Sequence, residues 1–216
     1  MPEPLDARER RELCDLFGDL GPSAPTLCEG WATLDLAAHL VVRERSPLAA
    51  PGILFGGPFE RVLERATGKA VARGYDHLVE QVRNGPPLGP FAVPVIRGIV
   101  NLNEYAVHHE DVRRANGLRP RTDRADLQAA LWRLLRRGAG LQLRRVDGAT
   151  VRLTSPASGD RAVDHVVVGR TGPEVTLTGA PLELVLYLFG RRRAAQVDVT
   201  GAPEARAILA QARLGI

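Results

Sequence analysis

The sequence predicts a helical first half joined to a small α+β domain. Two patterns carry this prediction. Apolar residues recur at helical spacing up to about residue 140, and short β-branched runs with strand-like alternation follow. The chain of 216 residues is long enough for two small domains. We place the boundary after residue 120, which assigns a helical bundle to residues 1–120 and an α+β domain to residues 121–216.

The first two helices are expected before residue 48. Asp6 and Glu9 form a capping pair for the first helix, and Gly21-Pro22 ends it. Its apolar face consists of Leu13, Leu16, Phe17 and Leu20. After a loop rich in Pro, Ser and Gly, Thr33 is expected to cap the second helix, which Pro47 closes.

Two longer helices are expected next. One runs from about 59 to 82, before the stop signal at 84–87, and the other runs from about Pro94 to Ala115. The segment 49–58 is expected to be the linker before them. Four long helices with short connections favour a bundle. A fifth helix, at about 123–138, is expected to bridge to the second half.

The second half is predicted to build a sheet covered by helices. Four short β-branched runs are separated by turn residues, at 141–147, 149–155, 164–170 and 174–179. An apolar helix at 181–192 must be buried on the sheet, and a last strand (195–201) and a last helix (203–214) follow it. This order is typical of an α+β domain.

Composition argues against several classes of partner. The net charge is +4, the basic residues are spread among acids, and aromatic residues are only 5%, a pattern that does not favour nucleic-acid binding. No run approaches the ~20 apolar residues of a membrane span, and the N-terminus has no apolar signal core. We therefore expect a cytoplasmic protein without a membrane partner. In that compartment, its two cysteines are not expected to form a disulfide.

The segment EYAVHHEDVRRA, residues 104–115, contains the strongest candidates for chemistry. Glu104 and His108 are four positions apart, so on a helix they project from one face and can reach the same ion. A third ligand should come from another helix. His39 is the best candidate, because an unpaired imidazole in the apolar run LDLAAHLV would be costly. Such a set leaves zinc an open position, as in catalytic sites. The alternatives are a surface Glu–His contact and a hydrogen-bonded core histidine.

Four neighbouring residues keep two interpretations each. His109 projects about 100° away from His108, which makes it a neighbour or surface residue, or else the ligand in place of His108. Asp111 either accepts the second ring proton of His108 or faces water. Asp35 either accepts the second ring proton of His39 or faces water, and it also suits a helix N-terminus. Cys28 is expected to serve in packing, the alternative being a nucleophile.

Three segments resemble a known family. PTLCEGWATLDLAAHLVVRE (25–44) and NEYAVHHEDVRRANG (103–117) resemble the loop-helix and fourth-helix motifs of the mycothiol-dependent maleylpyruvate isomerase family. That family belongs to the DinB/YfiT-like metal-binding helical bundles. LTGAPLELVLYLFGRRRAAQVDVTG (177–201) resembles its sterol-carrier-like C-terminal domain. The resemblance touches both halves of the chain in the right order.

The resemblance implies a divalent metal, usually zinc, held by His39, Glu104 and His108. The position of His109 is more usually a small residue in that family. Members of known activity use mycothiol as thiol cofactor or co-substrate, which implies a thiol-dependent isomerase or S-transferase acting on a small electrophile. An anionic substrate would need arginine partners, for which Arg191, Arg192 and Arg193 are candidates. The alternative is a non-catalytic metal- or small-ligand-binding protein. A monomer or a homodimer is expected.

Overall fold

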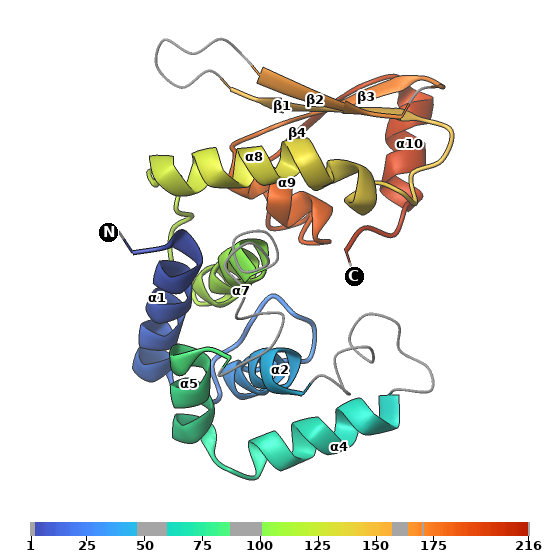
Figure 1. Ribbon diagram of the computed structural model, residues 1–216. Coiled ribbons are helices and arrows are strands. Elements are labelled where there is room, and N and C mark those ends of the chain that lie inside the picture. Colours follow the sequence, from blue (N-terminus) through green and yellow to red (C-terminus); the bar gives the residue numbers. More distant parts are fainter. Residues whose placement is uncertain (1–2, 47–59, 87–100, 157–163, 170, 216) are drawn as a thin grey trace. The chain divides into compact units, whose positions relative to one another are not determined.

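The computed structural model describes residues 3–46, 60–86, 101–156, 164–169 and 171–215 (Figure 1). The chain divides into two compact units, Met1–Pro120 and Arg121–Ile216. The described part of the first unit is helical, and the second combines helices with a four-stranded sheet. The predicted α+β class is thereby confirmed. No helix within these ranges is both long and apolar enough to cross a membrane.

The helices of the first unit pack around one apolar core. In the described parts of this unit they are α1 (Leu5–Leu20), α2 (Thr33–Arg45), α4 (Glu60–Val71), α5 (Tyr75–Asn84) and α7 (Leu102–Ala115). Helix α1 contacts α5 and α7, and α2 contacts α4 and α5. The largest buried side chains of this core include Leu13, Phe17, Leu36, Leu40, Leu78 and Tyr105. Each such apolar side chain contributes about 1.5–3 kcal/mol by leaving water.

The start of α1 differs from the prediction. The helix begins at Leu5 with Pro4 as its N-cap, and no side chain caps it. Asp6 and Glu9 therefore do not form a capping box. Glu9 instead lies one turn before Leu13 on the buried face and is 0% exposed. A buried carboxylate at this position needs a partner, and His109 supplies one.

The start of α2 is also shifted by one residue. Its N-cap is Ala32, and Thr33 is the first helical residue, whose hydroxyl donates to the Gly21 carbonyl. The Ala32 N–H donates to Asp35 Oδ2 over 2.9 Å. Asp35 thus satisfies the helix N-terminus, which was one of its expected roles.

The helix predicted over 59–82 is two helices in the structure. Helix α4 ends at Val71 and α5 begins at Tyr75, with Gly74 between them at φ +90°. Only glycine adopts this φ without strain, and the turn lets α5 pack against α1. The linker expected at 49–58 and the start expected at Pro94 lie outside the described residues.

The second unit opens with a helix longer than expected, α8 (Ala125–Gln142). The strand predicted at 141–147 is therefore wrong. Leu135, Ala139 and Leu143 are buried at intervals of four, so they continue the helical face through the segment that resembled a strand, while Leu141 is exposed. The alternating pattern arose from the end of a helix and the turn that follows it.

The sheet has the strand order β2-β1-β3-β4. Its strands are β1 (Thr150–Ser155), β2 (Asp164–Val168), β3 (Glu174–Thr178) and β4 (Asp198–Gly201). The central pair, β1 and β3, is parallel, and both outer pairs are antiparallel. The register Val151↔Val175 and Leu153↔Leu177 brings four buried side chains to one face.

Helices cover the apolar face of this sheet (Figure 1). Helix α8 contacts β2 and α9 (Pro181–Leu188), and α10 (Pro203–Gln211) contacts β3 and β4. Every residue of α9 is buried, as its apolar sequence predicts. Gly201 ends β4 at φ +116°, where a Cβ atom would lie 2.4 Å from the Glu174 carbonyl oxygen, so this close approach requires glycine.

Candidate metal centre

Two helices of the first unit supply the three predicted ligands. His39 projects from α2, one turn after Asp35, and Glu104 and His108 project from α7, one turn apart. The side chains of His39 and Glu104 are each 14% exposed, so they lie near the surface without facing open water. The structure thus brings together the three residues that spacing and resemblance selected.

One oxygen is the focus of this group. Glu104 Oε1 lies 3.1 Å from His39 Nε2 and 3.3 Å from His108 Nε2. Ligand atoms about 2.0–2.2 Å from a tetrahedral zinc ion are separated by roughly 3.3–3.5 Å. The two observed separations are close to that value. The spacing therefore suits donors arranged around one small divalent ion, with a coordination position left for a further ligand.

The electrostatics favour the ligand forms of Glu104 and His39. Burial alone would raise the pKa of Glu104, but Arg43 and the two imidazoles hold it well below its usual range. The guanidinium Nε of Arg43 lies 3.4 Å from Glu104 Oε1. Burial lowers the pKa of His39, which favours the neutral imidazole that a metal needs.

Asp111 positions His108 through a contact with the ring nitrogen Nδ1. Its Oδ2 lies 2.9 Å from His108 Nδ1, and its side chain is completely buried, so the alternative that it faces water is wrong. Burial by itself would lower the pKa of His108, yet the contacts with Asp111, Cys28 and Glu104 raise it well above its usual value. A carboxylate at Nδ1 fixes the tautomer that presents Nε2 to a metal.

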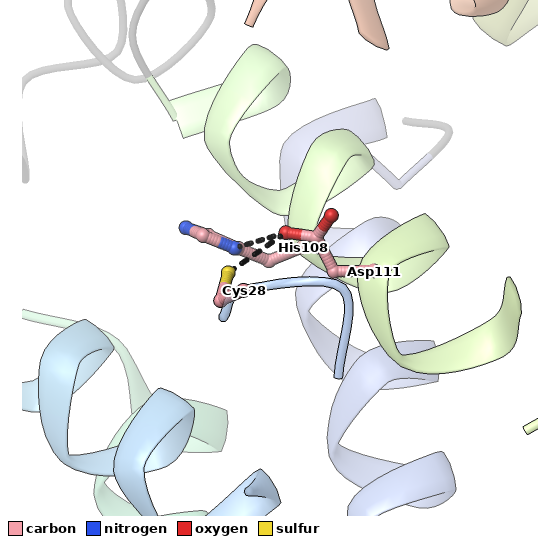
Figure 2. Close-up of side chains that lie close together, drawn as sticks. All are labelled: Cys28, His108 and Asp111. Atoms are coloured by element: carbon pink, nitrogen blue, oxygen red, sulfur yellow. Dashed lines mark hydrogen bonds and ion pairs between the residues drawn. The ribbon is translucent and has the colours of Figure 1, made fainter. Parts of the chain in front are cut away.

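Cys28 also belongs to this cluster, and its expected packing role stays a prediction. Its thiol donates to Asp111 Oδ2 over 3.3 Å, and Figure 2 shows it beside His108 and Asp111. The loop that carries Cys28 is fastened to α7, because the Leu27 N–H donates to the Asp111 carbonyl over 3.1 Å. The sequence gives no signal for this contact, since 83 positions separate Cys28 from Asp111.

His109 projects away from His108 around α7, toward Glu9 of α1, and it is buried, so its interpretation as a surface residue is wrong. Its Nδ1 lies 3.3 Å from Glu9 Oε2, and Glu12 lies close to both. The buried pair between α1 and α7 accounts for the histidine at this position. The sequence contains a signal for it, because Glu9 falls on the same helical face as Leu13 and Phe17.

Two further residues of the site were not predicted. Arg43 lies one turn after His39 on α2, so the spacing rule that paired Glu104 with His108 also indicates it. Trp31 precedes α2, and its ring centroid lies 5.1 Å from that of His39. Trp31 is 37% exposed, so part of its apolar ring faces solvent beside His39.

A buried chain of charges continues from Arg43 into the core. Arg43 Nη1 lies 3.9 Å from Glu44, whose two oxygens accept from Arg10 over 2.6 and 2.7 Å. The Tyr105 hydroxyl donates to Glu44 over 2.8 Å. The alternation of Glu104, Arg43, Glu44 and Arg10 balances charge within the interior.

The arginine run lies in the second unit and bonds backbone there. Arg191 donates to the Phe189 carbonyl. Arg192 donates to the carbonyls of Leu209, Ala210 and Ala212 at the end of α10. Both residues therefore have structural partners, and their expected role toward an anionic substrate stays a prediction.

Comparisons with family models, with curated proteins and with solved structures find no match to this chain.

Proposed function

We propose that this protein is a divalent-metal-dependent enzyme that activates a small thiol for addition to a small electrophile, as an isomerase or an S-transferase. The observation that carries the proposal is the convergence of His39 Nε2, Glu104 Oε1 and His108 Nε2, with separations of 3.1 and 3.3 Å from the shared oxygen. The resemblance of segments 25–44 and 103–117 to mycothiol-dependent isomerases favours mycothiol as the thiol.

The donor set fits zinc or a similar ion. Two imidazoles and one carboxylate are ligands of catalytic zinc sites, which keep a position open. A bound ion would supply positive charge at that position and so favour a thiolate there, the form of a thiol that is nucleophilic. His39, Glu104 and His108 would hold it, with a DinB-like bundle as their scaffold.

The surrounding residues have separable roles. Asp111 holds a proton at Nδ1 of His108, so a metal would take the place of the proton at Nε2. Arg43 keeps Glu104 ionised and fixes the position of its Oε1. The partly exposed Trp31 beside His39 offers an apolar surface to a small organic substrate.

The reaction follows from a thiolate nucleophile. Its sulfur forms a bond to an electrophilic carbon, the displaced electron pair moves to the acceptor group of the substrate, and a proton is taken up there. Reversal of this addition after rotation about the former double bond gives an isomerase. Release of the adduct gives an S-transferase.

A cobalt-substituted sample tests the proposal. We expect one cobalt ion per chain and a change in its visible absorption when mycothiol is added, with simple thiols acting at higher concentration. His39→Ala should lose the ion, whereas His77→Ala, which changes an exposed histidine on α5, should keep it. A cobalt spectrum that no thiol alters would favour the non-catalytic binding protein. Absence of stoichiometric metal would contradict both.

A further inference from the structure

A second set of donor atoms gathers at the opposite nitrogen of His108. The predicted metal site, where His39 and Glu104 meet His108, lies at the Nε2 atom of the His108 ring, and we call it the glutamate position. At Nδ1, Asp111 Oδ2 lies 2.9 Å away, and Cys28 Sγ lies 3.3 Å from that oxygen. One donor atom from each of Cys28, His108 and Asp111 lies within 4.8 Å of the others. Figure 2 shows the three side chains directed toward one another.

We propose that Cys28, Asp111 and the Nδ1 atom of His108 form a second metal position, which takes a thiophilic cation such as Cd²⁺ or Cu⁺. We call it the cysteine position. The proposal does not rest on the thiol-activating function, because it concerns only which ions the site accepts.

The geometry suits a single ion. For an ion of zinc's size, with bonds of about 2.0 Å to nitrogen and oxygen and about 2.3 Å to sulfur, tetrahedral donors lie roughly 3.3–3.5 Å apart. The observed 2.9 and 3.3 Å therefore widen on binding, and they widen more for the larger Cd²⁺. Cys28 is half-buried, whereas its two partners His108 and Asp111 are buried.

The loop presents Cys28 in a fixed position. The Leu27 N–H donates to the Asp111 carbonyl over 3.1 Å, and the Cys28 N–H donates to Thr26 Oγ1 over 3.1 Å. These bonds hold the thiol against α7 before any ion arrives. A prearranged donor set lowers the cost of ordering ligands on binding.

The donor chemistry selects soft ions. A thiolate prefers thiophilic metals, whereas the two-imidazole, one-carboxylate set at the glutamate position suits zinc. Binding of Cd²⁺ releases the thiol proton of Cys28 and leaves two anionic ligands against the two positive charges. Cys28 and Asp111 therefore neutralise a divalent ion without help from the glutamate position.

The two positions compete for His108. A neutral imidazole has one nitrogen lone pair free for a metal and one N–H. A cation at Nδ1 places the ring proton on Nε2, where it points at Glu104 Oε1 and removes His108 from the glutamate position. An ion at Nε2 has the opposite effect. The geometry therefore predicts mutual exclusion of the two ions.

Cadmium titration of metal-free protein tests the cysteine position. The thiolate-to-cadmium absorption in the ultraviolet should appear and saturate at one equivalent. Cys28→Ser should abolish it, as should alkylation of Cys28 in the unsubstituted protein. Cys14→Ser should retain it, because Cys14 is fully buried. No absorption in the unsubstituted protein, or full absorption in Cys28→Ser, would overturn the proposal.

Competition with zinc tests the sharing of His108. Zinc added first should raise the cadmium concentration at half-saturation at least tenfold in the unsubstituted protein. In His39→Ala, which lacks a ligand of the glutamate position, zinc should have much less effect. An unchanged cadmium midpoint in zinc-loaded protein would overturn mutual exclusion. The cadmium titration and the zinc competition use no substrate. Both can therefore be interpreted even if the protein does not activate a thiol.

Discussion

Asp111 Oδ2 lies 2.9 Å from His108 Nδ1, and no part of the Asp111 side chain reaches solvent. Glu104 approaches the same ring at Nε2 over 3.3 Å. In the absence of a cation, carboxylates at both nitrogens favour the doubly protonated imidazolium, which explains the raised pKa of His108. A metal at Nε2 would replace the proton there. Asp111 would then still hold the proton at Nδ1 and keep the ring oriented toward the metal.

Asp111→Asn should weaken metal binding without abolishing it. The amide keeps the shape of the side chain but loses the negative charge that orients His108 and raises its basicity. Loss of such a partner typically lowers metal affinity about 10–100-fold. Competition with a chromogenic chelator measures the change. Asp35→Asn is the matched control, because Asp35 bonds the Ala32 N–H, and its metal affinity should stay within about twofold of the original.

Arg43→Met should destabilise metal-free protein more than metal-loaded protein. Removing one member of a buried ion pair leaves an uncompensated charge at a cost of about 3–5 kcal/mol. A divalent ion restores a positive neighbour to Glu104. Thermal unfolding with and without zinc should therefore show a larger zinc-induced rise in Tm for the variant. An equal rise in both proteins would contradict the assigned pairing of Arg43 with Glu104.

His109→Phe should lower stability and leave metal binding intact. The substitution removes the imidazole partner of the buried Glu9 carboxylate, which costs about 1–3 kcal/mol. Urea unfolding measures this loss. Because His109 projects about 100° away from His108 and contacts Glu9 instead of the predicted ligands, the number of zinc ions bound per chain should be unchanged. Loss of the ion in this variant alone would make His109 the ligand.

Stability should fall at alkaline pH in part because of Cys14. Burial raises the pKa of the Cys14 thiol from 9.0 to about 12. The folded protein then keeps this proton where the unfolded chain releases it, so the contribution is complete below pH 9 and is lost as the pH rises toward 12. Cys14→Ala should show a shallower decline in unfolding free energy over that interval. Parallel curves for the two proteins would show that the thiol makes no such contribution.

The helix boundaries that the sequence indicates well are those marked by local chemistry. Gly21 ends α1 and Gly85 follows α5, as expected of glycine beyond a helix end. The i,i+4 rule likewise places Glu104 beside His108, because that relation depends only on helix geometry. His39 joins them through the fold, and its function as a ligand stays a prediction.

The features that escaped prediction depend on contacts between distant segments. The local pattern around Glu9 fits a helix cap, whereas packing against His109, 100 positions away, decides its role. The contact of Cys28 with Asp111 has the same origin. At 141–147 a period-two pattern over a few residues could not be distinguished from a helical end. Gly74 marks the break between α4 and α5, but the helical apolar spacing on both sides of it favours one continuous helix.

The position of Trp31 gives this protein an internal optical reporter. Its ring lies 5.1 Å from that of His39, close enough for a paramagnetic ion such as Co²⁺ or Cu²⁺ at the ligands to quench indole fluorescence. The chain has only two tryptophans, so replacing Trp132 with phenylalanine leaves a single emitter. Ion entry, exchange and thiol arrival could then be followed in real time, at micromolar protein and without any attached dye.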